Sequence, residues 1–592
     1  MSRRAGMGPV PYDGGVAFRV WAPHARAVAV TGSFSAWQLP GVPLAAEEEG
    51  RWAAEVPGVK PGDAYKYVIT SATGEELWRA DPYAAAMTGS VGESLVPERE
   101  FDWSGTENYR TPGWDELVIY EMHVGTFNDE PGGGPGRFAD VIPRLPHLAG
   151  LGVNAIELMP AAEFPGGFSW GYNPSAPFAV ETDLGGPVAL KELVREAHRH
   201  GIAVLLDVVY NHLGPHDLIL WRYDGWHEGG HGGGVYFYDD ARARTPWGDT
   251  RPDYGRPEVR AYLRDNALHW LEEYRLDGLR WDATAYIRDA DGTPLPDGWS
   301  LMRWINDEID RRQPWKISIA EDLRGDPRLT APTGDGGAGF DAQWDAAFVH
   351  PVRRAVTVAE DRDRDMRAVR AAVEHRLAAD APRRVVYTES HDEVANGRAR
   401  VPEEIWPGSA DSWFAKKRST LGAALVMTVP GVPMLFQGQE FLEDRWFDDR
   451  DPLDWTRASR FRGIVDLYRD LIALRRDRHG TTAGLRGDHV SVFHVNDTDK
   501  VLAYHRWRNG GRRDDTVVVA NFANRGYAHY SLGLPRDGLW RVRLNSDWEG
   551  YDPSFASHPA HDAQATPVPR DGLPCSASLA LGPYTAVILS QD

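Results

Sequence analysis

Between Leu117 and Phe436 the sequence alternates short apolar runs with longer amphipathic segments, and this alternation constrains the fold more than any other feature. The eight strand-like runs lie at 117–124, 154–159, 203–209, 276–281, 316–320, 340–344, 384–388 and 432–436. Most are separated by helical segments such as 256–275, where apolar residues recur on one face. The pattern predicts an α/β fold, a (β/α)8 TIM barrel; alternation alone leaves a doubly wound open sheet as the alternative.

Both flanks of this region predict all-β structure. Strand-like runs bounded by Gly, Pro and Asp precede it at 16–21, 27–32, 52–56 and 64–69. A helix at 461–476 follows it, and then come strand-like runs at 490–494, 501–507, 515–521, 539–544 and 585–589. We therefore predict an N-terminal β-sandwich (1–100), a linker (101–116), a catalytic barrel (117–480) with an insertion at about 213–254, and a C-terminal β-sandwich (481–592).

Composition narrows the class of partner. A net charge of −21 over 592 residues argues against nucleic acid or an anionic membrane as a partner. Cys575 is the only cysteine, which excludes an intrachain disulfide and a multi-cysteine zinc site and fits a reducing compartment. No apolar run approaches the roughly 18 residues that span a bilayer, and none follows Arg3 and Arg4 as in a signal peptide. We expect a cytoplasmic protein.

Polar residues gather where four of the predicted strands end. The segments are 207–212, 280–282, 321–322 and 389–393. In a barrel the carboxyl ends of the strands meet at one rim, where the following loops build the active site. The pattern therefore predicts at least four acids, two histidines and an arginine in one site.

These residue types suit the cleavage of a glycosidic bond with retention of configuration. That reaction needs two carboxyl groups about 5 Å apart, one to attack the anomeric carbon and one to protonate the leaving oxygen. Asp282 lies two residues after Arg280, so both side chains leave the strand on the same side. We predict Asp282 as the nucleophile with Arg280 as its charge partner, Glu321 as the acid/base, and Asp392 as a ligand for sugar hydroxyls. His212 and His391 are candidate donors to the same sugar.

Four ordered segments resemble the signature regions of the α-amylase family, glycoside hydrolase family 13. They are 207–212, 278–282, Glu321 after its apolar strand, and 390–392. The resemblance extends over roughly residues 115–475, and the segments 120–125, 170–173 and 431–440 agree with it.

The resemblance implies roles for further residues. If the chain is a member of the α-amylase family, Asp392 stabilises the transition state. Arg280, His212 and His391 then contact the sugar at the cleavage point. Tyr172 stacks on that sugar and Asp207 supports the floor of the site. Trp281 lies within a signature segment and Glu393 directly follows one, and both join the expected substrate-binding set. Glycosyl transfer requires no cofactor, and no acid cluster in 213–254 completes a calcium site, so we expect neither a cofactor nor a metal.

Several features bear on which member the chain resembles. The N-terminal segments 18–23 and 32–37 resemble the sandwich that precedes branching enzymes, debranching enzymes and maltooligosyltrehalose trehalohydrolases. The run 390–394 is similar to branching enzymes, whereas 245–248 is similar to trehalohydrolases. The resemblance implies an enzyme that cleaves α-1,4-glucosidic bonds through a covalent glucosyl-aspartate and makes α-1,6 branches in an α-glucan (glycogen, starch or maltooligosaccharides). A trehalohydrolase, an α-amylase and a non-catalytic glucan-binding protein are the alternatives. The sequence makes no prediction of oligomeric state.

Overall fold

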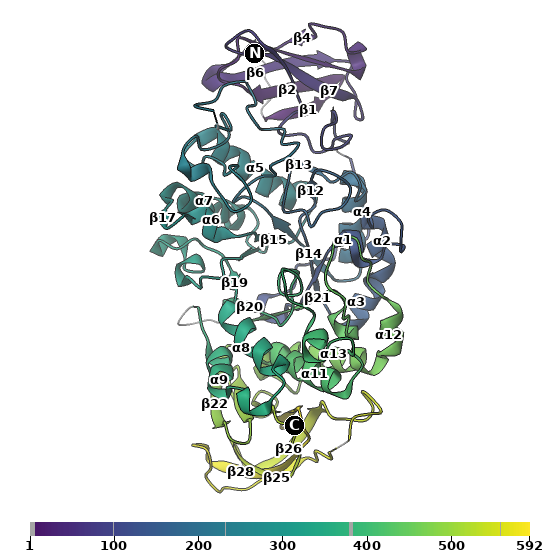
Figure 1. Ribbon diagram of the computed structural model, residues 1–592, viewed down its shortest axis with the longest axis vertical. Coiled ribbons are helices and arrows are strands. Elements are labelled where there is room, and N and C mark those ends of the chain that lie inside the picture. The colour runs from purple at the N-terminus through teal and green to yellow at the C-terminus, as the bar shows by residue number, and fades with distance from the viewer. Residues whose placement is uncertain (1–5, 99, 231, 378–382, 557) are drawn as a thin grey trace.

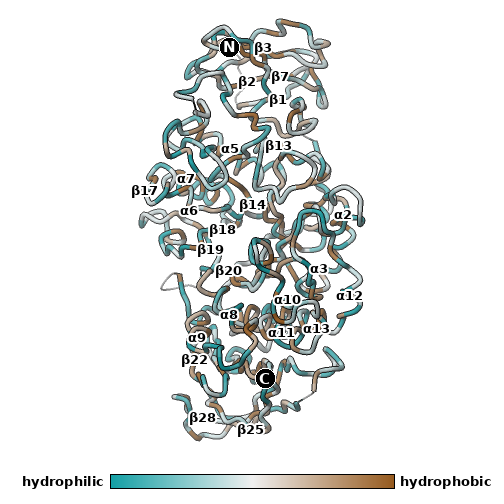
Figure 2. The backbone as a smooth tube through the Cα atoms, viewed as in Figure 1, coloured by the Kyte–Doolittle hydropathy of each residue, from teal (hydrophilic) through white to brown (hydrophobic). Residues whose placement is uncertain are grey.

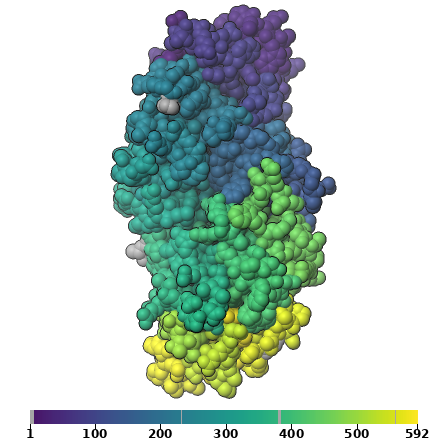
Figure 3. Space-filling model, in the orientation of Figure 1, coloured from purple at the N-terminus to yellow at the C-terminus, as the bar shows by residue number. Residues whose placement is uncertain are grey.

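The computed structural model describes residues 6–98, 100–230, 232–377, 383–556 and 558–592. Three parts follow one another along the long axis of the molecule (Figures 1 and 3). A β domain from the N-terminal residues lies at one end, the barrel lies in the middle, and a β domain from the C-terminal residues lies at the other end. No described helix combines the length and the apolar character needed to cross a membrane.

Eight parallel strands form a closed barrel, which confirms the predicted fold class and excludes the open sheet. In order around the barrel they are β10 (Ile119–Met122), β11 (Ala155–Leu158), β14 (Ala203–Val208), β15 (Gly278–Trp281), β18 (Ile317–Ala320), β19 (Ala342–Trp344), β20 (Arg384–Val386) and β21 (Val432–Phe436). The last strand pairs with the first, with Met434 opposite Ile119. Each strand ends at the same rim, so loops far apart in the sequence are brought together there.

Helices surround the barrel, and Figure 2 shows their apolar residues interleaved with hydrophilic ones along the chain. The longer helices are α3 (Leu145–Leu151), α4 (Gly186–Arg199), α5 (Pro257–Glu273), α7 (Pro296–Arg312), α8 (Ala346–Thr357), α9 (Met366–Glu374), α11 (Trp413–Thr428) and α13 (Arg462–Arg475). The shorter ones are α1 (Val124–Phe127), α2 (Phe138–Val141), α6 (Thr284–Arg288), α10 (Val401–Ile405) and α12 (Thr456–Arg460). The predicted helix 256–275 is α5; it begins at Pro257, whose fixed φ suits the first helical turn.

Side-chain alternation along the barrel strands separates two cores. Ile119, Ala155 and Leu205 pack inside the barrel, whereas Ile156 and Leu206 pack outward in the larger core that includes the helices. Every second residue of a strand therefore faces the barrel interior, and this period decides which side chains reach the site.

The N-terminal domain is built from two antiparallel sheets. One contains β1 (Gly8–Tyr12), β2 (Gly15–Trp21), β6 (Arg51–Pro57) and β5 (Ala45–Ala46). The other contains β4 (Val42–Pro43), β3 (Ala27–Gly32), β7 (Ala64–Thr70), β8 (Glu76–Arg79) and β9 (Ser94–Leu95). The ring of Tyr83 packs 4.7 Å from Phe178 and 5.2 Å from Tyr262 between ring centroids, which joins this part of the chain to the barrel.

The C-terminal domain has a six-stranded sheet and a two-stranded sheet. The first contains β22 (His489–Asn496), β23 (Val501–Trp507), β24 (Thr516–Asn521), β29 (Thr585–Ser590), β26 (Gly538–Asn545) and β27 (Ala563–Ala565). The second, β25 (Tyr527–Leu534) with β28 (Cys575–Leu581), was not predicted from the sequence. A buried ion pair between Lys417 of α11 and Asp547, 2.6 Å long, ties this domain to the barrel.

The segment 213–254 lies between β14 and α5 and holds little regular structure. Its ends are joined where the Leu213 amide donates to the Thr250 carbonyl at 3.2 Å. It also contacts the N-terminal domain, since Arg79 Nε donates to the Tyr223 carbonyl at 2.8 Å. Two further two-stranded antiparallel sheets lie among the loops: β12 (Ala162–Glu163) with β13 (Ala176–Val180), and β16 (Asp289–Ala290) with β17 (Thr293–Pro294).

Candidate active site

Arg280 is the centre of the charged network at the barrel mouth. It lies opposite Asp207 on neighbouring strands, and its side chain is fully buried. Its Nη1 donates to Asp207 Oδ2 at 2.5 Å and to Asp282 Oδ1 at 3.1 Å. The guanidinium also lies 4.3 Å from the centre of the Trp344 ring. A buried arginine is tolerated only with such partners, and here it fixes two carboxylates relative to one another.

Asp282 directly follows β15, and both of its carboxylate oxygens accept hydrogen bonds. One comes from Arg280, and the other comes from Asn211 Nδ2 at 2.8 Å. The two donors hold the carboxylate in one orientation, as a nucleophile requires. The strand ends sharply here, because Ala283 has a left-handed φ of 43°.

Glu321 directly follows β18 and approaches Asp282 from the neighbouring strand. Its Oε2 accepts from the Ala283 amide at 2.6 Å and lies 3.7 Å from Arg280 Nη2. Burial raises the pKa of Glu321 to about 7; Asp282 and Asp392 add to the rise, and Arg280 opposes it. A carboxyl group with this pKa carries a proton near neutral pH and can give it to a leaving oxygen.

Asp392 is the most open of the three carboxylates. Its side chain is 46% exposed, against 11% for Asp282 and 8% for Glu321. Its neighbour His391 lies 3.6 Å away through Nε2, and His391 Nδ1 lies 2.5 Å from Glu121 Oε1. Burial lowers the pKa of His391, but the charges of Asp392 and Glu121 outweigh it and raise that pKa to about 9. His391 is therefore a cation at neutral pH and can donate from Nε2.

Tyr172 and His212 complete one side of the site. The Tyr172 hydroxyl donates to Asp207 at 2.5 Å, and its ring stacks on His391 with centroids 5.0 Å apart. His212 Nε2 lies 2.8 Å from the Tyr172 carbonyl. Burial lowers the pKa of His212, so this ring is neutral at pH 7. The structure thus brings eight of the ten predicted residues into one connected group; Trp281 and Glu393 are the other two.

The prediction that Trp281 binds substrate is wrong. Its side chain is fully buried and packs edge-on against Tyr210 at 4.9 Å and Phe340 at 5.5 Å, between ring centroids. Arg280 and Asp282 face the barrel interior, and strand alternation therefore turns the residue between them outward. Glu393 is also buried, and its carboxylate pairs with Arg398. Its part in substrate binding stays a prediction.

Three further residues take part in the site without having been assigned a role from the sequence. Glu121 and Asn211 hold His391 and Asp282, and both lie inside segments that resemble the α-amylase family. Trp247 is 43% exposed; its ring stacks on His212 with centroids 4.5 Å apart and meets Tyr286 edge-on at 5.1 Å. The sequence signal for Trp247 is the run 245–248, which resembles trehalohydrolases.

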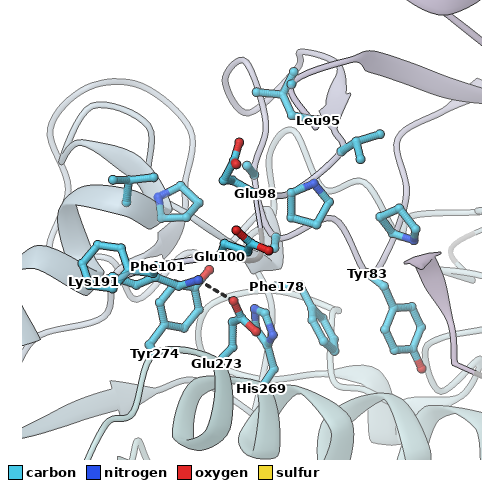
Figure 4. A pocket seen from close by; sticks show the side chains of 18 of the residues that line it. Tyr83, Leu95, Glu98, Glu100, Phe101, Phe178, Lys191, His269, Glu273 and Tyr274 are labelled. Atoms are coloured by element: carbon cyan, nitrogen blue, oxygen red, sulfur yellow. Dashed lines mark hydrogen bonds and ion pairs between the residues drawn. The ribbon is translucent and has the colours of Figure 1, made fainter. Parts of the chain in front are cut away.

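A hollow elsewhere in the molecule shares no residue with this site. It lies between the N-terminal residues and helices α4 and α5 (Figure 4). Its walls include Tyr83 and Phe178, and its Lys191 and Glu273 pair with each other. Within the described ranges, no group of three or more His, Cys, Asp or Glu side chains is placed to hold a metal ion.

Three family models match the chain. They are carbohydrate-binding module 48 (isoamylase N-terminal domain) at residues 6–84, the α-amylase catalytic domain at 121–220, and the α-amylase C-terminal all-β domain at 493–592. A 1,4-α-glucan branching enzyme of Corynebacterium jeikeium is 32% identical over 97% of this chain and 82% of its own. One from Xanthomonas euvesicatoria pv. vesicatoria is 34% identical over 99% of this chain and 80% of its own. This chain belongs to the family of 1,4-α-glucan branching enzymes.

Solved structures of other proteins share this fold. A putative α-amylase from Salmonella typhimurium has a TM-score of 0.76 at 23% identity and covers 99% of both chains. A type I pullulanase from Bacillus subtilis, complexed with maltose, has a TM-score of 0.77 at 20% identity and covers 100% of this chain and 86% of its own. The predicted resemblance to the α-amylase family is confirmed. The sequence interpretation that put this chain nearest to branching enzymes is confirmed as well.

Proposed function

We propose that this protein is a 1,4-α-glucan branching enzyme, with an α-glucan as both donor and acceptor. The observation that carries the proposal is similarity to branching enzymes over almost the whole chain, including both β domains. The geometry of the barrel mouth supports it, because an oriented carboxylate and a protonated carboxyl group lie on neighbouring strands around one arginine. These are the groups that a retaining glycosyl transfer needs.

In the first half of the proposed reaction, Asp282 attacks C1 of a glucose unit. The C1–O4 bond breaks as the C1–carboxylate bond forms, and Glu321 gives its proton to O4 of the departing fragment. Arg280 and Asn211 hold the Asp282 carboxylate in position for this attack. Charged His391 donates to a sugar hydroxyl beside Asp392. The product is a glucan ester of Asp282 and a shortened chain.

In the second half, ionised Glu321 removes the proton from a glucan 6-hydroxyl. That oxygen attacks C1, the ester bond to Asp282 breaks, and an α-1,6 linkage remains. Two displacements at C1 retain its configuration. If water takes the place of the 6-hydroxyl, the same groups perform hydrolysis. The acceptor is therefore the point that an experiment must decide.

The deciding experiment follows purified enzyme on amylose by proton NMR, with reducing ends measured in parallel. New α-1,6 signal with little gain in reducing ends is the expected result. A gain in reducing ends without new branches would contradict the proposal and make the protein a hydrolase. Asp282→Asn enzyme, purified in the same way, is the matched control, because it should keep the fold but lacks the nucleophile.

Hydrolysis of a trehalose-capped maltooligosaccharide is the second candidate, and Trp247 favours it. This exposed ring stands over His212 within the run 245–248, which is similar to trehalohydrolases. A flat aromatic ring there can receive a sugar ring next to the cleaved bond. Release of free trehalose from such a substrate, faster than branching of amylose, would support this reading over the first.

A further inference from the structure

Glu157 is a buried carboxyl group inside the barrel that the proposed reaction does not use. It lies on β11, where Ala155 faces the barrel interior and Ile156 faces outward, so Glu157 also faces inward. It is 1% exposed. In the part of the chain that the structure describes, neither of its carboxyl oxygens has a hydrogen-bond partner. An unpaired ionised carboxylate in such a place carries a large desolvation cost.

Charged groups face Glu157 from four neighbouring elements. They are Glu121 on β10, Asp207 on β14, Arg280 on β15 and His391 beyond β20. Glu121 is the residue directly opposite Glu157 in the parallel register, and neighbouring strands lie only about 4.8 Å apart. Glu121 is likewise 1% exposed. Two ionised carboxylates at this spacing and burial would repel strongly, so the pair favours one proton between them.

Hydrogen bonding decides which of the two carries the proton. Glu121 Oε1 lies 2.5 Å from His391 Nδ1, and Glu121 Oε2 accepts from the His391 amide at 3.1 Å. These donors stabilise the ionised form of Glu121. Glu157 has no such donor. Burial, reinforced by the charges of Glu121 and Asp207, raises the pKa of Glu157 well above its usual value, although Arg280 and His391 oppose the rise.

We propose that Glu157 is a positioning residue that works as a neutral carboxylic acid, and that its neutrality leaves Glu121 ionised as the anchor of His391. Glu157 fills a polar position beneath the site without adding a second negative charge. Glu121 then holds the His391 ring through Oε1 and the His391 backbone amide through Oε2, and His391 Nε2 stays beside Asp392. Ionisation of Glu157 would put a competing anion near His391 and Arg280 and would loosen that arrangement.

The test is Glu157→Gln, which keeps the shape of a neutral carboxyl group but cannot ionise. We expect this variant to fold, to cleave α-1,4 bonds within about threefold of the wild-type rate, and to keep the wild-type pH profile below neutrality. At alkaline pH its activity relative to wild type should rise, because only the wild-type residue can become charged there. Counting cleaved α-1,4 bonds makes the result independent of whether the acceptor is a glucan or water.

Glu121→Gln is the matched control, because it makes the same chemical change on the neighbouring strand. It should lose about tenfold or more in turnover, since it removes the anion that holds His391. An infrared difference spectrum between wild type and Glu157→Gln at pH 7.5 should contain the carbonyl band of a protonated carboxyl group. Absence of that band, a loss of activity above about thirtyfold, or failure of Glu157→Gln to fold would each overturn the proposal.

Discussion

One strand of the barrel carries a buried aspartate at each end, and the two ends differ in what they do. Asp277 directly precedes β15 at the base of the barrel, and Asp282 directly follows it at the mouth. At the base, Asp277 Oδ1 accepts from the Thr111 hydroxyl at 2.7 Å. Asp277 Oδ2 accepts from the Val204 amide at 2.9 Å and lies 2.8 Å from His198 Nε2.

Buried acids at the base and at the mouth of the barrel have pKa values shifted in opposite directions, as Asp277 shows at the base and Glu321 and Asp207 show at the mouth. Burial acts to raise the pKa of Asp277, but His198, Lys316 and Thr111 outweigh it and hold that pKa below its usual value. At the mouth, burial raises the pKa of Glu321 and of Asp207 to about 7 in each case. Burial alone thus identifies neither a structural nor a catalytic acid. The difference lies in whether the surrounding donors satisfy the ionised form.

Among the variants that test this comparison of base and mouth, Asp282→Asn is expected to have the largest effect on turnover. Loss of the nucleophile should lower turnover by at least about 10⁴-fold, because no covalent intermediate can form. The fold should be retained with a modest fall in Tm, because the single amide oxygen can accept from Arg280 or from Asn211 but not from both. Substantial residual turnover measured on amylose, beyond the level of contaminating enzyme, would disprove the nucleophile assignment.

Glu321→Gln should have the next largest effect on rate, a loss of about 10²- to 10⁴-fold. In the wild type, the rate of bond cleavage should fall as pH rises through about 7, since Glu321 then loses the proton it must donate. Because the folded-state pKa of Glu321 is raised, its contribution to stability falls as pH rises from its usual pKa to about 7, and the full cost is present above that pH. The variant should therefore be at least as stable as wild type at pH 8, which chemical denaturation can measure; a marked loss of stability would contradict this.

At the base of the barrel, Asp277→Asn should lower stability and leave the catalytic rate almost unchanged. It weakens a buried pair with His198, so the free energy of unfolding should fall by about 2–3 kcal/mol, while turnover per folded molecule stays near wild type. The folded-state pKa of Asp277 is depressed, so its stabilisation is present above the unfolded value and lost as pH falls below about 4. Urea titrations at pH 7 and at about pH 3 would test this, because the difference between the two proteins should shrink at the lower pH. Equal stability of both proteins at pH 7 would remove the contrast between the base and the mouth of the barrel.

The smallest expected effects, on KM and Tm, distinguish the roles of Trp247 and Trp281. Trp247→Ala should raise the KM for maltooligosaccharides by about 3- to 10-fold, the strength of one stacking contact, with little change in Tm. Trp281→Phe should leave KM unchanged and lower Tm, since that ring packs between Tyr210 and Phe340. Kinetics on short glucans and a thermal melt of both variants distinguish the roles; a raised KM in Trp281→Phe would show that Trp281 does contact the substrate.

Most of the barrel strands were predictable because each is a short apolar run, and helices such as α4 and α13 between or after them bury one face, although α11 is buried on all sides. The sheet of β25 and β28 was missed because β25 mixes exposed and buried residues without a strict period. Asp282 and Glu321 were predictable because each directly follows an apolar strand, whereas Asp207 lies within β14 and Asp392 lies beyond the end of β20. Trp281 was misassigned because its neighbours in the sequence are both in the site, although a period of two puts it on the opposite face.

By itself the sequence determined the fold class, the family and the residues that end on the barrel rim, because strand period, helix period and motif spacing are local properties. Only the tertiary structure decided which of those residues meet, and in which charge state. Glu121 and His391 are far apart in the chain yet 2.5 Å apart in space, and Trp247 reaches His212 from a segment with little regular structure. The pKa of a buried acid depends on every charge around it, and those charges are brought together only when the barrel closes.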